Sequence, residues 1–453
     1  MLTLALAIAG AVAGCGALAR QQASTVSPNS TASSGGARPR ADAARGRFSR
    51  VTLRVPAVNS AFGRPHVVTV PRGWTAEVWA IVPLARLEVW TPEGDLLVSS
   101  PYNGFIDELT PSRVRSRPPV RSTLLSGLHY PQGMAFASLG GQEYLFVAES
   151  NEIVRYAWRD GAPGARTVIV RGLPDGGAHP LKNVVVASDH TVYFDIGSAS
   201  NAGPPGGTTP PRATVIAVNP NGDHLRVFAT GVRNGDGLSI APDGTLWTAV
   251  NERDDIAYPF HEPYGGHADA YQNVMASYVD NHPPDELARL TAGLDLGWPY
   301  CDPDPDVHPG RAGAALNYGD MPFDADAQTN PGGRTLRCST LPRIDRGLPA
   351  HSAPLGFHFL QGSRLPRPWS VGAVVAVHGS WDREPPRAPA VLWLPWEAGT
   401  RTLGPAITLV GGFQKPDGSR WGRPVDAVPG PDGALYVSDD QTGAVYRLVP
   451  PGS

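Results

Sequence analysis

The feature that most constrains this chain is a short hairpin pattern that recurs along its length. Between residues 237 and 250, two runs of alternating apolar and polar residues flank a Pro-Asp-Gly turn, which is typical of a β-hairpin with one buried face. The pattern therefore indicates a sheet unit that repeats. About six such units follow one another, at residues 84–100, 132–158, 183–198, 237–251, 355–396 and 425–448.

The number of units and the near absence of helical periodicity between them predict an all-β fold, a six-bladed β-propeller over residues 50–453. Two stacked β-sandwiches are the alternative. A propeller must join its first and last blades. The strand-like segments 67–70 or 77–81 are candidates to pair beside the C-terminal blade and hide its edge.

The repeat is interrupted at about residues 255–285 by an aromatic, Pro-rich segment, which we interpret as a long insertion that can serve as a lid over one face. It contains His261, His267 and His282. Their spacing matches no pattern of metal ligands, and exposed loop histidines are the commoner case. We therefore assign no metal ion to these three histidines.

Composition supports a turn-rich β protein and excludes one class of partner. The chain has 453 residues with 52 Gly and 47 Pro, and only 17% of its residues are charged. Its formal net charge of −3 provides no basic field for nucleic acid. A nucleic-acid partner is therefore not expected.

The N-terminal residues are typical of an export signal. An apolar run ends in Val-Ala-Gly-Cys, which resembles a bacterial lipobox with Cys15 as the lipidated residue. We interpret residues 1–19 as the signal peptide and the Ser/Ala/Pro/Arg-rich residues 20–49 as a disordered tether. An ordinary signal peptide or an uncleaved anchor is the alternative, since no Lys or Arg precedes the run. The protein is then expected to be an extracytoplasmic lipoprotein, periplasmic or at the cell surface, with its lipid as the only membrane contact.

Two further cysteines, Cys301 and Cys338, are predicted to form a disulfide. They are the only cysteines beyond the tether. An even number of cysteines in an exported chain is typical of disulfide pairing. Two unpaired buried thiols are the alternative.

Candidate functional residues lie in the loops that precede the first strand of several units. They are Gln132, His179, the pair Arg233 and Asn234, and the pair Arg420 and Arg423. In a propeller these loops converge on the central channel. A neutral histidine can accept a proton, and a neighbouring arginine can hold an oxygen that gains negative charge. A surface histidine in a Gly-rich loop is the alternative for His179 alone.

Several blocks together resemble the glucose/sorbosone dehydrogenase family, quinoproteins of six-bladed propeller fold that use pyrroloquinoline quinone (PQQ) and calcium. The resemblance runs from about Trp74 to Val449, and the order and spacing of its blocks make it specific. The blocks are residues 173–201, 230–251, 293–301, 350–359, 377–383 and 420–440.

The resemblance implies roles for three residues in the oxidation of a sugar. His179 falls on the general base, which removes the hydroxyl proton at the anomeric carbon while hydride passes to the quinone. Arg233 falls on the arginine that stabilises the developing anion, and Asn234 falls on its neighbour in the cofactor site. An aldose or sugar aldehyde is then the substrate, and an external acceptor takes the electrons.

The resemblance also implies cofactor contacts. Gln132 and Arg423 fall on residues that bind the quinone, with Arg420 and Arg383 as weaker candidates for the same work. The calcium ion is expected at the backbone carbonyls of Glu252 and Arg253.

Ala178 departs from the glucose-oxidising members, which carry an aspartate before the base, so the sorbosone-type branch is the closer match. In that branch a disulfide near the Gly-Trp-Pro segment is also expected.

Two other functions compete with a dehydrogenase. One is a non-catalytic propeller that binds sugars or proteins, and the other is a metal-dependent lactone hydrolase, for which we find no set of inward carboxylate and Asn ligands. If His179, Arg233 and Arg423 converge on one cavity, the dehydrogenase is favoured over the non-catalytic binding protein.

Overall fold

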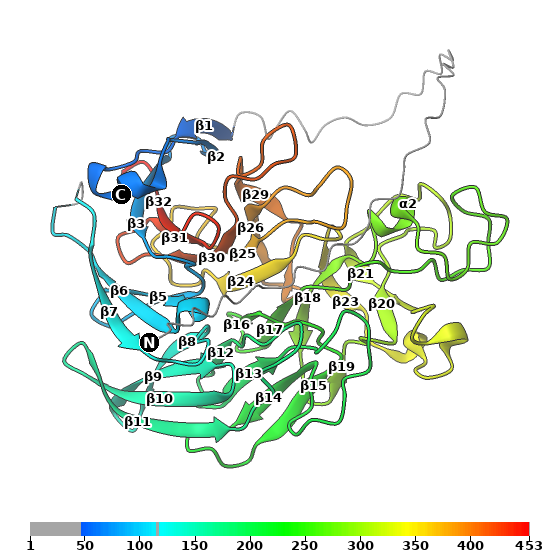
Figure 1. The fold of residues 1–453 in the computed structure, drawn as a ribbon, viewed down its shortest axis with the longest axis horizontal. Helices are drawn as coiled ribbons and strands as arrows, with labels where there is room; N and C mark the ends of the chain where they lie inside the picture. The colour runs from blue at the N-terminus through cyan, green and yellow to red at the C-terminus, as the bar shows by residue number, and fades with distance from the viewer. Residues whose placement is uncertain (1–46, 115–116, 453) are drawn as a thin grey trace, which may run out of the picture. The chain divides into compact units, whose positions relative to one another are not determined.

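The computed structural model describes residues 47–114 and 117–452. Their strands form six sheets around a common centre, which confirms the predicted six-bladed β-propeller (Figure 1). The predicted signal peptide with Cys15, and residues 20–46 of the predicted tether, lie outside the described residues. Among the residues that are described, no helix is both long enough and apolar enough to cross a membrane.

Blades 1, 2 and 5 each contain four antiparallel strands in chain order, with the first strand innermost. The predicted hairpin units supply the inner strands of each blade. Blade 1 contains β4 (Glu88–Trp90), β5 (Leu96–Ser100), β6 (Phe105–Thr110) and β7 (Val120–Ser126); blade 2 contains β8 (Met134–Leu139), β9 (Gln142–Glu149), β10 (Glu152–Arg159) and β11 (Ala162–Arg171); blade 5 contains β24 (Pro354–Phe359), β25 (Ala373–Val377), β26 (Ala390–Leu394) and β29 (Ile407–Val410).

Blades 3 and 4 each gain a fifth strand from the chain between β18 and β23. The short β19 (Leu294–Asp295) adds in parallel to the edge of blade 3, and β21 (Gly319–Met321) pairs with the last strand of blade 4. Blade 3 otherwise contains β12 (Val184–Val186), β13 (Val192–Ile196), β14 (Thr214–Val218) and β15 (Arg226–Thr230); blade 4 contains β16 (Gly237–Ile240), β17 (Leu246–Val250), β18 (Asp285–Leu290) and β23 (Ile344–Leu348).

Blade 6 joins the two ends of the described chain. Its strands are β30 (Pro424–Pro429), β31 (Leu435–Asp439) and β32 (Ala444–Val449). The last of them, β32, pairs with the N-terminal strand β3 (Thr75–Ile81), from Thr75 opposite Val449 to Ile81 opposite Ala444. Of the two segments predicted to close the ring, 77–81 therefore does so. The other, within β2 (Val67–Pro71), pairs with β1 (Phe48–Thr52) instead. Strand β1 begins inside the last residues assigned to the tether, because Phe48 and Val51 pack against the core.

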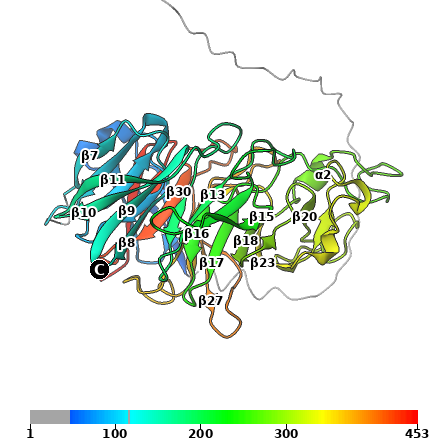
Figure 2. The ribbon, with the colours of Figure 1, turned by 90° about the horizontal axis from the view of Figure 1, so that it is seen from below.

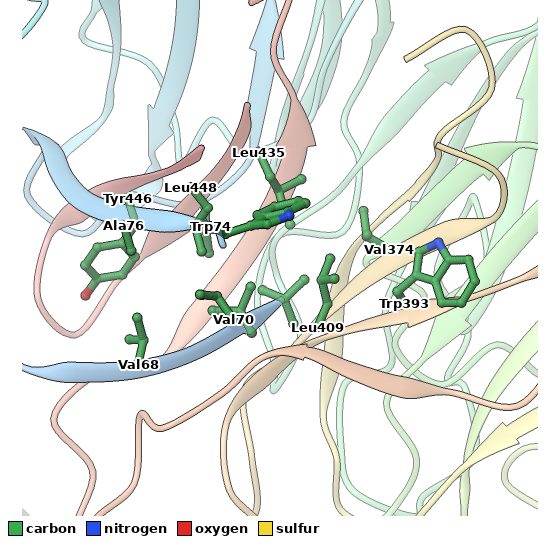
Figure 3. Close-up of a cluster of buried hydrophobic side chains, with 14 of the residues drawn as sticks. Val68, Val70, Trp74, Ala76, Val374, Trp393, Leu409, Leu435, Tyr446 and Leu448 are labelled. Atoms are coloured by element: carbon green, nitrogen blue, oxygen red, sulfur yellow. The ribbon is translucent and has the colours of Figure 1, made fainter. Parts of the chain in front are cut away.

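Apolar side chains fill the spaces between neighbouring blades. Phe146 of blade 2 packs with Phe194 and Ile216 of blade 3, and all three are fully buried. The largest cluster joins blades 5 and 6 with β2 and includes Val70 and Trp74 (Figure 3). Full burial of a large apolar side chain contributes about 1.5–3 kcal/mol, so these clusters hold the blades at fixed positions around the channel.

Two excursions interrupt blade 4. The predicted insertion, at about residues 255–285, lies between β17 and β18 except for Asp285, which begins β18; it includes the short helix α2 (Ala276–Val279) and a small core around Tyr258 and Tyr278. The second excursion, between β18 and β23, contains β20 (Cys301–Pro303) paired with β22 (Phe323–Ala325). Both lie beside blade 4 (Figure 2). The predicted disulfide between Cys301 and Cys338 is confirmed, with Cα atoms 5.6 Å apart.

The remaining elements are short. Strands β27 (Trp396–Glu397) and β28 (Thr402–Leu403) form a hairpin between β26 and β29. Short 3-10 segments occur at Ala57–Phe62, Pro101–Asn103, Pro331–Gly333 and Cys338–Thr340.

Candidate active site

The candidate residues come from equivalent loops of different blades. The innermost strands of all six blades line a central cavity of about 420 Å³, but none of the candidate residues is among those that line it. Gln132 lies shortly before β8, His179 before β12, Arg233 and Asn234 before β16, and Arg423 before β30. Because each of these strands starts at the same end of the channel, the loops before them meet there.

His179 is held as a neutral base with one defined tautomer. Its Nδ1 lies 3.2 Å from the carbonyl oxygen of Ser198 and 2.9 Å from the Ser198 Oγ. That hydroxyl donates its own hydrogen to the carbonyl of Ser200 at 2.7 Å, so both neighbours of Nδ1 are acceptors. Nδ1 therefore carries the hydrogen, and Nε2 keeps a free lone pair. Burial, and next the positive charge of Arg233, lower the pKa of His179 to about 4.

Arg233 is a buried cation fixed by three acceptors. Only 4% of the residue is exposed. Its Nε and Nη2 donate to the carbonyl and side-chain oxygens of Asn201 at 3.0 and 2.9 Å, and its Nη1 donates to the carbonyl of Asn251 at 2.9 Å. A guanidinium has five N–H donors, so two remain for another group. Burial lowers the pKa of Arg233, although negative charge at Glu252 and Asp254 opposes this effect.

Gly197 lies between Asn234 and His179 and leaves room for both side chains. A Cβ at Gly197 would lie 2.5 Å from the Cβ of His179 and 3.1 Å from the Oδ1 of Asn234, so only glycine leaves these two residues their places. The structure therefore brings His179, Arg233 and Asn234 together at the start of β12 and β16.

A chain of polar contacts continues around the channel, through residues that sequence reasoning missed. Gln132 is fully buried and donates to Oδ1 of Asp236 at 3.1 Å, while its Oε1 accepts from Nε of Arg86 at 2.8 Å. Arg86 also pairs with Asp440 at 3.0 Å, and Asp440 accepts from Nε2 of His378 at 2.9 Å. The channel end is thus lined by charges held in fixed positions.

Arg423 and Arg420 add positive charge to this chain. Nε of Arg423 donates to the carbonyl of His378 at 3.3 Å. Burial lowers the pKa of both arginines. The charge of Arg423 lowers the pKa of Arg420 further, whereas Asp440 raises the pKa of Arg423 and Arg86 lowers it. Asp440 thus offsets part of the positive charge at Arg423, and an anion beside Arg420 and Arg423 would be stabilised by both guanidinium groups.

Arg383, the fourth predicted cofactor contact, is placed apart from this group. Its Nε donates to the carbonyl of Asp280 at 3.0 Å, and its Nη1 donates to the carbonyl of Pro385. Both partners are backbone groups at the excursion 255–285 and the loop after β25. Its side chain thus connects these two loops.

Glu252 and Arg253, the predicted calcium ligands, follow β17 beside Arg233. The amide of Glu252 donates to Oδ1 of Asp285 at 2.9 Å, whereas the carbonyl oxygens of Glu252 and Arg253 accept no hydrogen bond within residues 47–114 and 117–452. Burial raises the pKa of the Glu252 carboxyl to about 8, although the charge of Arg233 opposes the shift. The Arg253 side chain points elsewhere, since it pairs with Asp326.

Comparisons with known proteins agree with this architecture. The family model TrAA12-like matches residues 68–450. The calcium structure of the Trichoderma reesei Carbohydrate-Active Enzymes Family AA12 protein is 20% identical with a TM-score of 0.67, covering 84% of this chain and 96% of that one. The holo form of the pyranose dehydrogenase PQQ domain from Coprinopsis cinerea is 19% identical with a TM-score of 0.67, covering 84% and 97%.

A curated relative extends the comparison at the level of sequence. An uncharacterized protein of Borreliella burgdorferi is 28% identical over 268 residues, which is 58% of each chain. The chain thus spans little more than half the length of that relative. The two solved structures, at such low identity, are evidence for a shared fold.

Proposed function

The chain belongs to the TrAA12-like family, and from that premise we propose that it is a quinone-dependent sugar dehydrogenase. Its substrate is an aldose or a related sugar aldehyde, its cofactors are PQQ and calcium, and an external acceptor takes the electrons. One observation carries the proposal: the neutral imidazole of His179 lies next to the buried guanidinium of Arg233 where the channel-lining strands begin.

The residues around the channel fit an anionic cofactor. PQQ carries carboxylates, and guanidinium groups are the side chains that bind carboxylates in a bidentate manner. Besides burial, the charge of Arg423 lowers the pKa of Arg420, and a carboxylate bound beside both guanidinium groups would offset this effect. Among the structural relatives, the domain from Coprinopsis cinerea is described as a PQQ domain, which supports the same choice of cofactor.

The segment after β17 fits a calcium ion. Ca²⁺ takes oxygen ligands, including backbone carbonyls. The carbonyls of Glu252 and Arg253 are without hydrogen-bond partners in the described chain. The carboxyl of Asp285 contacts the Glu252 amide, and Asp254 directly follows Arg253. We assign these two carbonyls as the calcium ligands that the protein supplies.

The chain's own residues provide the proton transfer and the charge stabilisation. Oxidation of the anomeric C–OH to C=O releases a proton and a hydride, and bound PQQ supplies the hydride acceptor. His179 takes the hydroxyl proton at Nε2, while its Nδ1–H remains bonded to Ser198. The two remaining N–H groups of Arg233 stabilise negative charge that develops beside the base. Ala178 in place of an aspartate supports the sorbosone-type branch.

The test is reconstitution of the purified protein with PQQ and calcium, followed by dye-linked assays over a panel of aldoses and sugar aldehydes. His179→Gln should lower kcat by about 100-fold or more, the usual scale for a general base, without weakening quinone binding. Arg423→Ala should weaken quinone binding first, because it removes a charge-assisted contact.

His224→Gln serves as the control, because His224 lies in an exposed turn of the same blade as His179. Normal turnover by His179→Gln would contradict the assigned base. If the wild-type protein oxidises no sugar with the quinone present, the binding-protein function replaces the dehydrogenase.

A further inference from the structure

A histidine and two aspartates meet where the two excursions of blade 4 lie against each other. Nε2 of His282 lies 3.4 Å from Oδ1 of Asp306 and 3.8 Å from Oδ1 of Asp304. One ligand atom from each residue lies within 4.8 Å of the others. His282 lies near the end of the excursion 255–285, and the aspartates follow β20. None of the three contributes to the channel-lining residues described above.

His282 presents an unpaired nitrogen to the two carboxylates. Its Nδ1 lies 2.9 Å from the carbonyl of Tyr278 and therefore carries the hydrogen of the neutral ring. The imidazole stacks on the ring of Tyr278, with centroids 4.0 Å apart and planes 9° apart. Only 5% of His282 is exposed, and its Nε2 has no hydrogen-bond partner in the described chain. A carbonyl that fixes the tautomer and frees the other nitrogen is the usual support of a metal-bound histidine.

The carboxylates lack compensating charge. Asp304 is 3% exposed, and no lysine or arginine within the described ranges pairs with Asp304, Asp306 or the neighbouring Asp324. One oxygen of Asp304 and one of Asp324 also lack hydrogen-bond partners. Buried carboxylates are ordinarily paired or bound to a cation, so this group of acceptors is suited to a bound cation.

Solvent can reach the group. A cavity of about 320 Å³ is lined by His282, Asp306 and Arg311, with Tyr264 and Asn281 beside them. An ion could therefore enter and leave without unfolding of either excursion.

We propose that His282, Asp304 and Asp306 bind a divalent transition-metal ion, of the kind represented by Zn²⁺ or Mn²⁺, which joins the two excursions of blade 4. Imidazole nitrogen with carboxylate oxygens suits these ions, whereas Ca²⁺ takes oxygen ligands. The bound ion ties residues 255–285 to the segment after β20. This site is independent of the proposed quinone and calcium site.

The alternative without metal is a protonated His282 that pairs with the carboxylates. The full-length protein, stripped with a chelator and kept in millimolar calcium to fill oxygen-only sites, is titrated with ZnCl₂ and with MnCl₂ by calorimetry at neutral pH. We expect one ion per chain and a rise in Tm on binding. His282→Gln should weaken binding by about 100-fold or more, since loss of a supporting contact alone typically costs 10- to 100-fold.

His261→Gln is the matched control. His261 belongs to the same excursion but its side chain is 70% exposed and contacts Asp269, so metal binding should be unchanged. Asp306→Asn, which preserves the shape of the side chain, covers the case in which His282→Gln fails to fold, and it should also weaken binding. Equal affinity in the wild type and in both ligand variants, or no binding by the wild type, would overturn the proposal.

Discussion

A single methyl group at Gly197 should displace the candidate base without removing any functional group. Gly197 directly follows β13, and the Cβ of an alanine there would lie 2.5 Å from the Cβ of His179. Ordinary contact begins at 3.4 Å, so the two groups must separate by about 0.9 Å (3.4 − 2.5). The carbonyl of His179, 3.0 Å away, and Oδ1 of Asn234, 3.1 Å away, limit the directions in which they can move.

The expected effect of Gly197→Ala is a loss of turnover with the fold preserved. A displacement near 1 Å in a catalytic group can cost about 100-fold in rate, and overpacking of this kind costs about 1–3 kcal/mol of stability. Quinone binding should change little, because Arg423 and Gln132 lie in other blades.

The measurements are kcat in the reconstituted dye-linked assay, quinone affinity by fluorescence titration, and Tm. Gly207→Ala is the control, since a Cβ there meets nothing within 4 Å. Full turnover by a folded Gly197→Ala protein would refute the argument that His179 must occupy this position for catalysis.

Three further results are expected. Burial, and next Arg233, lower the pKa of His179 from 6.5 to about 4, so between these pH values the unfolded chain binds more protons than the folded one. The unfolding free energy of the apoprotein should therefore rise with pH between about 4 and 6.5. In denaturant titrations at several pH values, His179→Gln should reduce the slope of unfolding free energy against pH. Replacing Cys301 and Cys338 with serine should lower stability by about 4 kcal/mol, from a separation of 37 residues in the chain-entropy model; an unchanged denaturation midpoint would contradict this. Cys15→Ser should release the protein from membranes on fractionation, and unchanged membrane association would show that Cys15 is not lipidated.

The fold was predictable because each blade repeats a local signal. Alternating apolar residues around a Pro-Asp-Gly or similar turn specify a hairpin, and six hairpins with little helix between them leave few architectures. The fifth strands of blades 3 and 4 were not predictable, since β19 has two residues and β21 has three. Such short strands carry no periodicity, and their pairing depends on where the excursion after β18 places them.

Candidate site residues could be proposed from the sequence where a polar residue lies in the loop just before an inner strand, as at Gln132 and Asn234. Arg86 occupies the same position before β4, but apolar Leu84 and Ala85 precede it, and the loop has no Gly-rich or polar signature.

The His282 group was missed for another reason. The three histidines of the excursion share a segment but not a site, and the true neighbours of His282 are the aspartates at 304 and 306, which follow in a separate excursion.

The contacts that close the propeller and those that line the candidate site are partly the same. Arg86, at the start of blade 1, pairs with Asp440, which directly follows β31, and its carbonyl accepts from the hydroxyl of Ser438. The amide of Glu88 donates to Oδ2 of Asp426 at 2.9 Å across the same junction. Because these bonds link the first and last blades, the position of Arg86 depends on the pairing of β3 with β32. Arg86 in turn orients Gln132. Closure of the ring therefore sets the position of the polar chain around the channel as well as the stability of the fold.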